Sequence, residues 1–252
     1  MSKRQLALIL ATLFCLLSPA VQAGLGIGLS AAAFSHQGDQ TLRAAGYGFA
    51  IWAVIYLGLA AFAVFQGRRA RRDDPLLGAL AAPAALAIVG AGAWIWASAF
   101  NARWLSVAII VGSAAVLTLG LARQTRRVEP LDRSAAVLAW TPLCLLAGWL
   151  TIASTLNILT VLTAEALIAP GSARAAFAGL GASALIALSV LLHRRMWPYG
   201  LPIVWGLVAV WVAEQTVKPA VAALALACAA VIGLVVVTQA WRSLSGRIAR
   251  AV

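Results

Sequence analysis

An uncharged stretch of 21 residues, Gly46 to Gln66, constrains this chain more than any other feature. About 20 apolar residues, each rising 1.5 Å, cover the roughly 30 Å hydrocarbon core of a bilayer, so the stretch predicts a membrane-spanning helix. Phe49, Trp52 and Tyr56 lie at positions i, i+3 and i+7 and therefore share one helix face. Contact with lipid alone does not require this arrangement, so the shared face is a candidate functional surface.

The whole chain has the composition of a membrane protein. Of its 252 residues, 63% are hydrophobic and 10% are charged, and the mean hydropathy is +0.95. A soluble domain of this size could not bury so much apolar surface, so membrane lipid is the expected surrounding. The net charge of +12 does not indicate nucleic acid as a partner, because the arginines separate apolar runs and form no basic stripe with interleaved aromatic residues.

Apolar runs alternate with charged or polar loops along the sequence. This pattern predicts an all-α, polytopic transmembrane bundle of about eight helices. We expect the first helix to run as far as Phe34 and a polar loop to cover 35–45. The later spans are expected at 46–66, 76–100, 104–122, 137–163, 175–192, 201–213 and 219–240. The N-terminal run also resembles a signal peptide that ends near residues 21–23, but its length favours a retained helix.

The positions of Lys and Arg test the count of eight helices. With the N-terminus in the cytoplasm, inner segments hold 15 of the 19 Lys and Arg residues, and outer segments hold only Arg43, Arg103, Arg174 and Lys218. Cytoplasmic loops of membrane proteins are enriched in these residues, and an error of one helix would destroy the asymmetry. We therefore predict a multi-pass protein of the inner (cytoplasmic) membrane with both termini in the cytoplasm.

Aromatic residues of three predicted helices lie at similar depth in the outer half of the membrane. Trp52 is on the second helix, Trp96 and Phe100 share a face of the third, and Trp149 is near the middle of the fifth. A common cavity and ordinary helix packing explain Trp52 and Trp149 equally well. For the tryptophans near span ends an interfacial belt is the simpler interpretation; these are Trp104, Trp140, Trp197, Trp205 and Trp241.

Polar residues within or near the spans are few. Asn157 follows Trp149 by eight residues, and its amide must bond either to a neighbouring helix or to a molecule in a cavity. Glu165 and Glu214 lie at outer helix ends, where we expect water to solvate them. No ionisable residue is near the centre of a span, which disfavours an ion-coupled pump. The cysteines lie singly in apolar runs and suggest neither a metal cluster nor a disulfide framework; they are Cys15, Cys144 and Cys228.

Two motifs resemble a known family. The segment FAIWAVIYLGLA, with Trp52 and Tyr56 four apart, and the segment WLTIASTLN, with Trp149 eight residues before Asn157, resemble the second and fifth helices of the tryptophan-rich sensory protein (TspO/MBR) family. This family is related to the mitochondrial translocator protein. The resemblance covers about residues 5–163, the five-helix unit of the family, so we expect a first unit at 1–163 and an extension of three helices with a basic tail at 164–252.

The resemblance implies a ligand site. Proteins of this family bind tetrapyrroles, sterols and other flat apolar molecules between their helices, and some have been proposed to degrade porphyrins with light. The implied ligand-binding residues are Phe49, Trp52, Tyr56, Trp96, Phe100, Trp149, Ala153 and Asn157. We add the hypothesis that Arg43 and Arg103 pair with acidic groups of such a ligand; the alternative is that both are solvated.

Several functions stay open at this stage. The leading interpretation is a binding, sensory or carrier protein for a hydrophobic small molecule. A small-solute or lipid transporter, completed by the last three helices, is the alternative, and an enzyme acting on a porphyrin is a third. The implied wall contains no His, Met or Cys to ligate a haem iron, which favours a metal-free ligand. The sequence leaves open whether the protein forms a homodimer.

Overall fold

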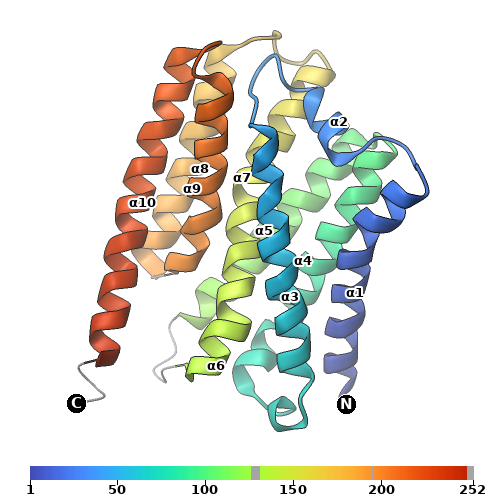
Figure 1. Ribbon diagram of the computed structural model, residues 1–252, viewed down its shortest axis with the longest axis vertical. Coiled ribbons are helices and arrows are strands. Elements are labelled where there is room, and N and C mark those ends of the chain that lie inside the picture. The colour runs from blue at the N-terminus through green and yellow to red at the C-terminus, as the bar shows by residue number, and fades with distance from the viewer. Residues whose placement is uncertain (126–130, 195, 249–252) are drawn as a thin grey trace.

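The computed structural model describes residues 1–125, 131–194 and 196–248. Over these residues the fold is a bundle of long helices joined by short connections (Figure 1). In chain order the elements are α1 Lys3–Gly24, α2 Ala31–His36, η1 Gly46–Ala50, α3 Ile51–Gly67, η2 Arg69–Arg71, α4 Pro75–Ala99, α5 Arg103–Gln124, α6 Arg133–Ala135, η3 Ala136–Trp140, α7 Thr141–Ala164, α8 Ala173–Arg194, α9 Trp197–Glu214 and α10 Pro219–Ile248. The η1 and η2 segments are 3₁₀ turns, and η3 is a π-helical turn that leads into α7.

The protein is a polytopic helical membrane protein, as predicted. Within the described ranges, seven helical segments are long and apolar enough to cross a membrane. The eighth expected span corresponds to α9, which has 18 residues, begins at Trp197 rather than Leu201, and contains Pro198 and Pro202. It is not among the seven, yet it packs along both α7 and α10 as part of the bundle.

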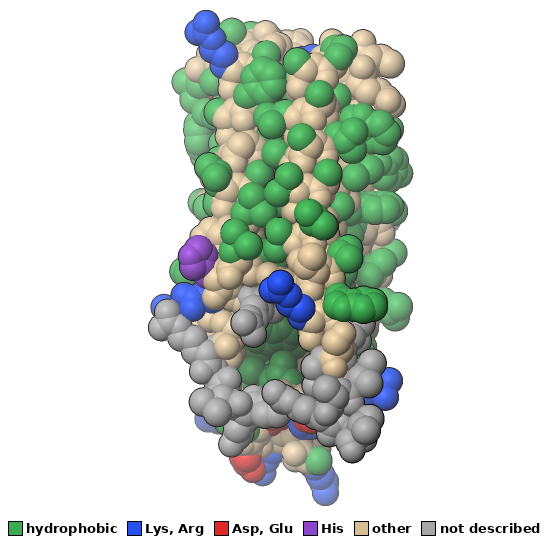
Figure 2. Space-filling model, turned by 90° about the vertical axis from the view of Figure 1, so that its left-hand side faces the viewer, with side chains coloured by type: hydrophobic (Ala, Val, Ile, Leu, Met, Phe, Trp, Pro, Cys, Tyr) green, Lys and Arg blue, Asp and Glu red, His purple; other side chains and the backbone are tan. Residues whose placement is uncertain are grey.

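Both ends of the described chain lie at the same end of the bundle. Figure 1 shows the start of α1, the last turns of α10, and the arginine-rich η2 region at that end, whereas α2 lies at the opposite end. In Figure 2 hydrophobic side chains cover the visible side of the molecule between the two ends. Large apolar side chains on several helices are mostly exposed in the absence of lipid, among them Leu57, Leu185 and Val237. An apolar belt of this kind is the surface that a bilayer covers.

Local sequence sets the helix ends near the predicted cytoplasmic side. Asp74 caps α4 by accepting hydrogen bonds from the backbone N–H groups of Leu76 and Leu77, and Pro75 occupies the first turn, where its missing N–H is not needed. Ser2 and Gln5 form a reciprocal capping box on α1. These caps satisfy donors that would otherwise have no partner at the membrane surface.

The expectation of one continuous first helix as far as Phe34 is wrong. The helix α1 ends at Gly24, because Gly26 and Gly28 adopt positive φ angles of 62° and 64° that reverse the chain. A Cβ at Gly28 would overlap the carbonyl group of Ala99, so only glycine allows this close approach to the end of α4. Residues 31–36 then form the separate helix α2, which places Phe34 inside the bundle with 1% of its surface exposed.

The last three helices pack closely on the rest of the bundle. At Gly148 of α7 an added Cβ would overlap the carbonyl oxygen of Tyr199, so the α7 and α9 backbones approach within contact distance. Tyr199 is fully buried, and its hydroxyl lies 2.9 Å from the hydroxyl of Thr151. Small residues commonly allow such backbone contact between membrane helices. The division of the chain near residue 163 stays a prediction. The close packing of α9 on α7 is also what a single unit would show.

Candidate ligand-binding site

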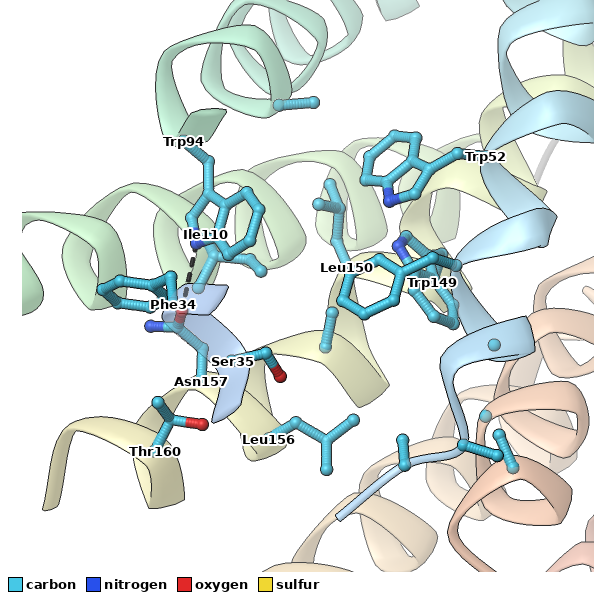
Figure 3. Close-up of a pocket in the computed structure, with 18 residues that line it drawn as sticks. Phe34, Ser35, Trp52, Trp94, Ile110, Trp149, Leu150, Leu156, Asn157 and Thr160 are labelled. Carbon is cyan, nitrogen blue, oxygen red and sulfur yellow. Dashed lines mark hydrogen bonds between the residues drawn. The ribbon is translucent and has the colours of Figure 1, made fainter. Parts of the chain in front are cut away.

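A cavity lies between helices near the α2 end of the bundle (Figure 3). Three regions of the chain enclose it: α2 and the segment that leads into α3, the middle of the bundle (α3, α4, α5 and α7), and α9. Its lining residues are Phe34, Ser35, Ala44, Ala45, Gly48, Phe49, Trp52, Ala91, Trp94, Ile110, Trp149, Leu150, Ala153, Leu156, Asn157, Thr160, Gly206 and Ala209. Helices that are far apart in sequence therefore contribute to one site.

The structure brings together five of the eight residues proposed for ligand binding. Phe49 and Trp52 of the second span and Trp149, Ala153 and Asn157 of α7 all line the cavity. The rings of Trp52 and Trp149 are 6.3 Å apart between centroids and nearly perpendicular, at 81°. This edge-to-face contact is a favourable geometry for aromatic pairs. Their role in binding a ligand stays a prediction.

Tyr56 stands behind this pair rather than in the wall. It is not among the lining residues, but its ring lies 5.1 Å from that of Trp52 with an interplanar angle of 32°. Because Trp52 is in contact with both Tyr56 and Trp149, its indole is held between two other rings. Tyr56 therefore supports the cavity wall indirectly.

On the third span the structure corrects the expected face. Trp94 lines the cavity, whereas Trp96 and Phe100 do not. Trp96 turns toward α1 and donates a hydrogen bond from Nε1 to Ser18 Oγ at 3.1 Å. Phe100 stacks on Trp96 and leaves 67% of its surface exposed. Trp94 and Trp96 thus lie on different faces of α4, and the face of Trp94 is the one that borders the cavity.

Asn157 joins three helices at the far side of the cavity. Its Oδ1 accepts a hydrogen bond from Trp94 Nε1 at 3.0 Å, drawn as a dashed line in Figure 3, and its Nδ2 donates one to Ser106 Oγ at 3.0 Å. Phe34 meets the edge of Trp94 with ring centroids 6.1 Å apart. The prediction of an interhelical bond is confirmed, and the same amide also forms part of the cavity lining.

Sequence reasoning missed the contributions of the outer segment, which we define as residues 37–48, and of α9. From the first come Ala44, Ala45 and Gly48, and from α9 come Gly206 and Ala209. These residues are small and carry no reactive group, so no chemical signal marks them in the sequence. The close approach of α9 does explain their size, because a Cβ on Gly48 would lie only 3.2 Å from that of Ala209.

The two arginines expected to pair with a ligand are bonded within the protein, and neither lines the cavity. Arg103 forms an ion pair with Glu165 at 3.0 Å and donates to Gln37 Oε1. Arg43 donates a hydrogen bond from Nη2 to the carbonyl oxygen of Ala213. Pairing with acidic groups of a ligand stays a prediction, and it would require these bonds to break.

The expectation that Glu214 is solvated is wrong. Its side chain is 0% exposed at the end of α9, whereas that of Glu165 remains 37% exposed. Glu214 Oε1 accepts a hydrogen bond from the backbone N–H of Arg43 at 2.7 Å and lies 3.7 Å from Lys218 Nζ. Two cationic side chains and a backbone donor thus surround this carboxylate, since Arg43 Nε is also only 3.6 Å away.

The chemical character of the cavity is apolar and aromatic. Its described lining contains no ionisable residue, and polar atoms come from Ser35, Asn157, Thr160 and the indole N–H groups. In the part of the chain that the structure describes, no three His, Cys, Asp or Glu residues are grouped to hold a metal ion. The cavity volume is about 60 Å³. That space accommodates a very small apolar molecule, whereas sites for drug-sized ligands span roughly 300–1,000 Å³.

The fold and the site define a polytopic α-helical membrane protein with an aromatic cavity between its helices. Comparison with protein families matches residues 5–238 to the family described as TSPO-like protein, and the chain belongs to that family. The match continues beyond residue 163, where the recognised motifs end, and includes most of the last three helices. No curated protein and no solved structure matches the chain.

Proposed function

We propose that this TSPO-like membrane protein binds a flat hydrophobic ligand, such as a metal-free tetrapyrrole or a sterol, in the cavity bounded by Trp52, Trp94 and Trp149. The bound state would serve a sensory, regulatory or carrier role in the inner membrane. The observation that carries the proposal is the edge-to-face pair of Trp52 and Trp149 on the wall of an apolar cavity. Family membership agrees with this reading of the site.

The chemistry of the wall favours a planar apolar molecule. Indole and phenyl faces gain about 0.5–1.5 kcal/mol per aromatic contact beyond the burial of area. The absence of ionisable groups among the described lining residues disfavours a small charged solute, because a charge there would lose its hydration without a partner. A few polar atoms, among them Ser35 Oγ and Thr160 Oγ1, are available to orient a ligand.

The small volume of the cavity means that the protein must change shape to bind a large ligand. A tetrapyrrole needs several times the 60 Å³ that the cavity offers, so the helices or the outer segment must move when the ligand binds. In this proposal the structure represents the closed state. Such a rearrangement lowers the apparent affinity by the free energy of opening.

Equilibrium titration of the purified protein in lipid nanodiscs with metal-free protoporphyrin tests the proposal. We expect saturable binding, followed by porphyrin absorbance, that weakens about tenfold or more in Trp149→Ala and Trp52→Ala. Trp241→Ala is the matched control, because Trp241 on α10 is 72% exposed and does not line the cavity. Equal losses in all three variants, or no saturable binding in the wild type, would refute the assignment.

Transport is the second candidate, and one observation favours it. Helix α9 contributes Gly206 and Ala209 to the cavity wall, so one of the last three helices is part of the site and could help to form a path. Ligand-dependent flux in proteoliposomes, reduced by Gly206→Leu, would support transport. Saturable binding without flux would leave the sensory or regulatory role.

A further inference from the structure

The outer segment, residues 37–48, is held to the α9–α10 corner by a dense set of bonds. Lys218 Nζ donates to the backbone carbonyl oxygens of Gln40 at 2.6 Å and Thr41 at 2.8 Å. The backbone N–H of Ala45 donates to the carbonyl oxygen of Ala209 at 2.9 Å. Trp205 Nε1 donates to the carbonyl oxygen of Gly48 at 3.0 Å. From Gln40 to Gly48 the segment is therefore bonded to α9 and to the α9–α10 turn.

Glu214 is the central group of this set. Its Oε1 binds the backbone N–H of Arg43 at 2.7 Å and lies within 4 Å of the cationic groups of both Arg43 and Lys218. Arg43 also donates to the Ala213 carbonyl oxygen, and Lys218 donates to the outer segment. The Glu214 carboxylate therefore contacts both of the cationic side chains that bind at this corner. No other acidic residue is recorded as an ion-pair partner of Arg43 or Lys218 in the described chain.

The carboxylate is buried without full compensation. Its second oxygen, Oε2, has no hydrogen-bond partner among the described residues. A buried oxygen with no partner costs free energy in this state, which reduces the net advantage of keeping the corner closed. This cost reduces the free energy that would be needed to open the corner.

We infer that Glu214 is a positioning residue that holds the outer segment against α9 and thereby controls access to the aromatic cavity. The segment supplies Ala44, Ala45 and Gly48 to the wall, so its release from α9 removes one side of the cavity. Release also supplies the volume that a large ligand needs. The inference relies on the proposed function only in identifying this cavity as the ligand site.

The test measures access directly and uses no ligand. A reporter cysteine replaces Ala153, which lines the cavity, in a variant whose Cys15, Cys144 and Cys228 are changed to Ala. The rate of its modification by a small, membrane-impermeant methanethiosulfonate is then measured in nanodiscs. Loss of bonds to a charged group shifts an opening equilibrium by on the order of ten- to a hundredfold, so we expect Glu214→Ala to raise the rate by that factor and Glu214→Gln to raise it less.

Two controls separate access from general loosening. A reporter at Ala87, fully buried in α4 and outside the cavity lining, should keep its slow rate in every variant. Asp132→Asn removes a carboxylate that pairs with Arg71 at the end of the bundle opposite to the outer segment, so the Ala153 reporter should be unaffected.

Lys218→Met provides an independent route to the same result, because it removes the bonds to Gln40 and Thr41 and leaves Glu214 in place. We expect faster modification of the Ala153 reporter in this variant as well. An unchanged rate in folded Glu214 and Lys218 variants overturns the inference, and so does an equal rise at Ala87. Failure of porphyrin binding alone would overturn the proposed function but not this control of access.

Discussion

Replacement of Asn157 tests how α4, α5 and α7 are held together around the cavity. Asn157 is 5% exposed and makes two interhelical hydrogen bonds, to Trp94 Nε1 and Ser106 Oγ. Asn157→Leu keeps the size of the side chain but removes both bonds. Interhelical bonds in membrane proteins contribute about 0.6 kcal/mol on average and up to about 1.7 kcal/mol. The indole N–H left without a partner adds a further cost, so we expect a total loss of about 1.5–3 kcal/mol.

A double-mutant cycle isolates the bond between Trp94 and Asn157. The free energy of unfolding is measured by denaturation in SDS–lipid mixed micelles for Asn157→Leu, Trp94→Phe and the double variant. We expect a coupling energy of about 0.6–1.7 kcal/mol. Ser154→Ala is the control, because Ser154 is similarly buried on α7 but donates only to Leu150 of its own helix, and it should cost less than about 0.5 kcal/mol. A coupling energy below about 0.3 kcal/mol would show that the bond does not join the helices.

Two further predictions concern helix contact and pH. Gly148→Ala should destabilise the protein by about 3 kcal/mol or more in the same assay, because its Cβ overlaps the Tyr199 carbonyl; Gly181→Ala, which has open space, should be neutral or slightly stabilising. At the predicted cytoplasmic end, the hydrogen bond from Arg71 holds the pKa of Asp132 well below its usual range. This pair should stabilise the fold above about pH 4 and lose that effect as the pH falls, so the melting temperatures of wild type and Asp132→Asn should converge toward pH 3. The difference should correspond to less than about 1 kcal/mol, since the pair is partly exposed.

The sequence was most informative about the membrane spans. The hydrocarbon thickness fixes the length of a spanning helix, and charged residues in the loops mark its ends. Six of the eight predicted spans therefore agree with the observed ones to within a few residues. The first helix was less predictable, because the weakly polar run 25–34 has the hydropathy of a span. Only the backbone shows that Gly26 and Gly28 break it.

The candidate site could be predicted only in part, for a physical reason. In a membrane helix, apolar residues face both lipid and protein, so periodicity does not show which face is inward. Trp52 and Trp149 were identified because their neighbours at helical spacing include other aromatic or polar residues. On α4, small apolar residues surround the helix on all sides, and nothing in the sequence distinguishes the face of Trp94 from that of Trp96.

Helix α9 shows why the site extends beyond the motifs that suggested it. Its small residues Gly206 and Ala209 allow the outer segment and α7 to approach, and its last residue, Glu214, binds that segment through charge. One helix thus contributes both to the cavity wall and to the contact that holds the outer segment. Gly206 and Glu214, which serve these two roles, lie about two turns apart on α9. A movement of α9 relative to α7 would therefore change the volume of the cavity and its closure together. If the cavity binds a ligand as proposed, α9 is the helix through which its occupancy would affect the position of the outer segment.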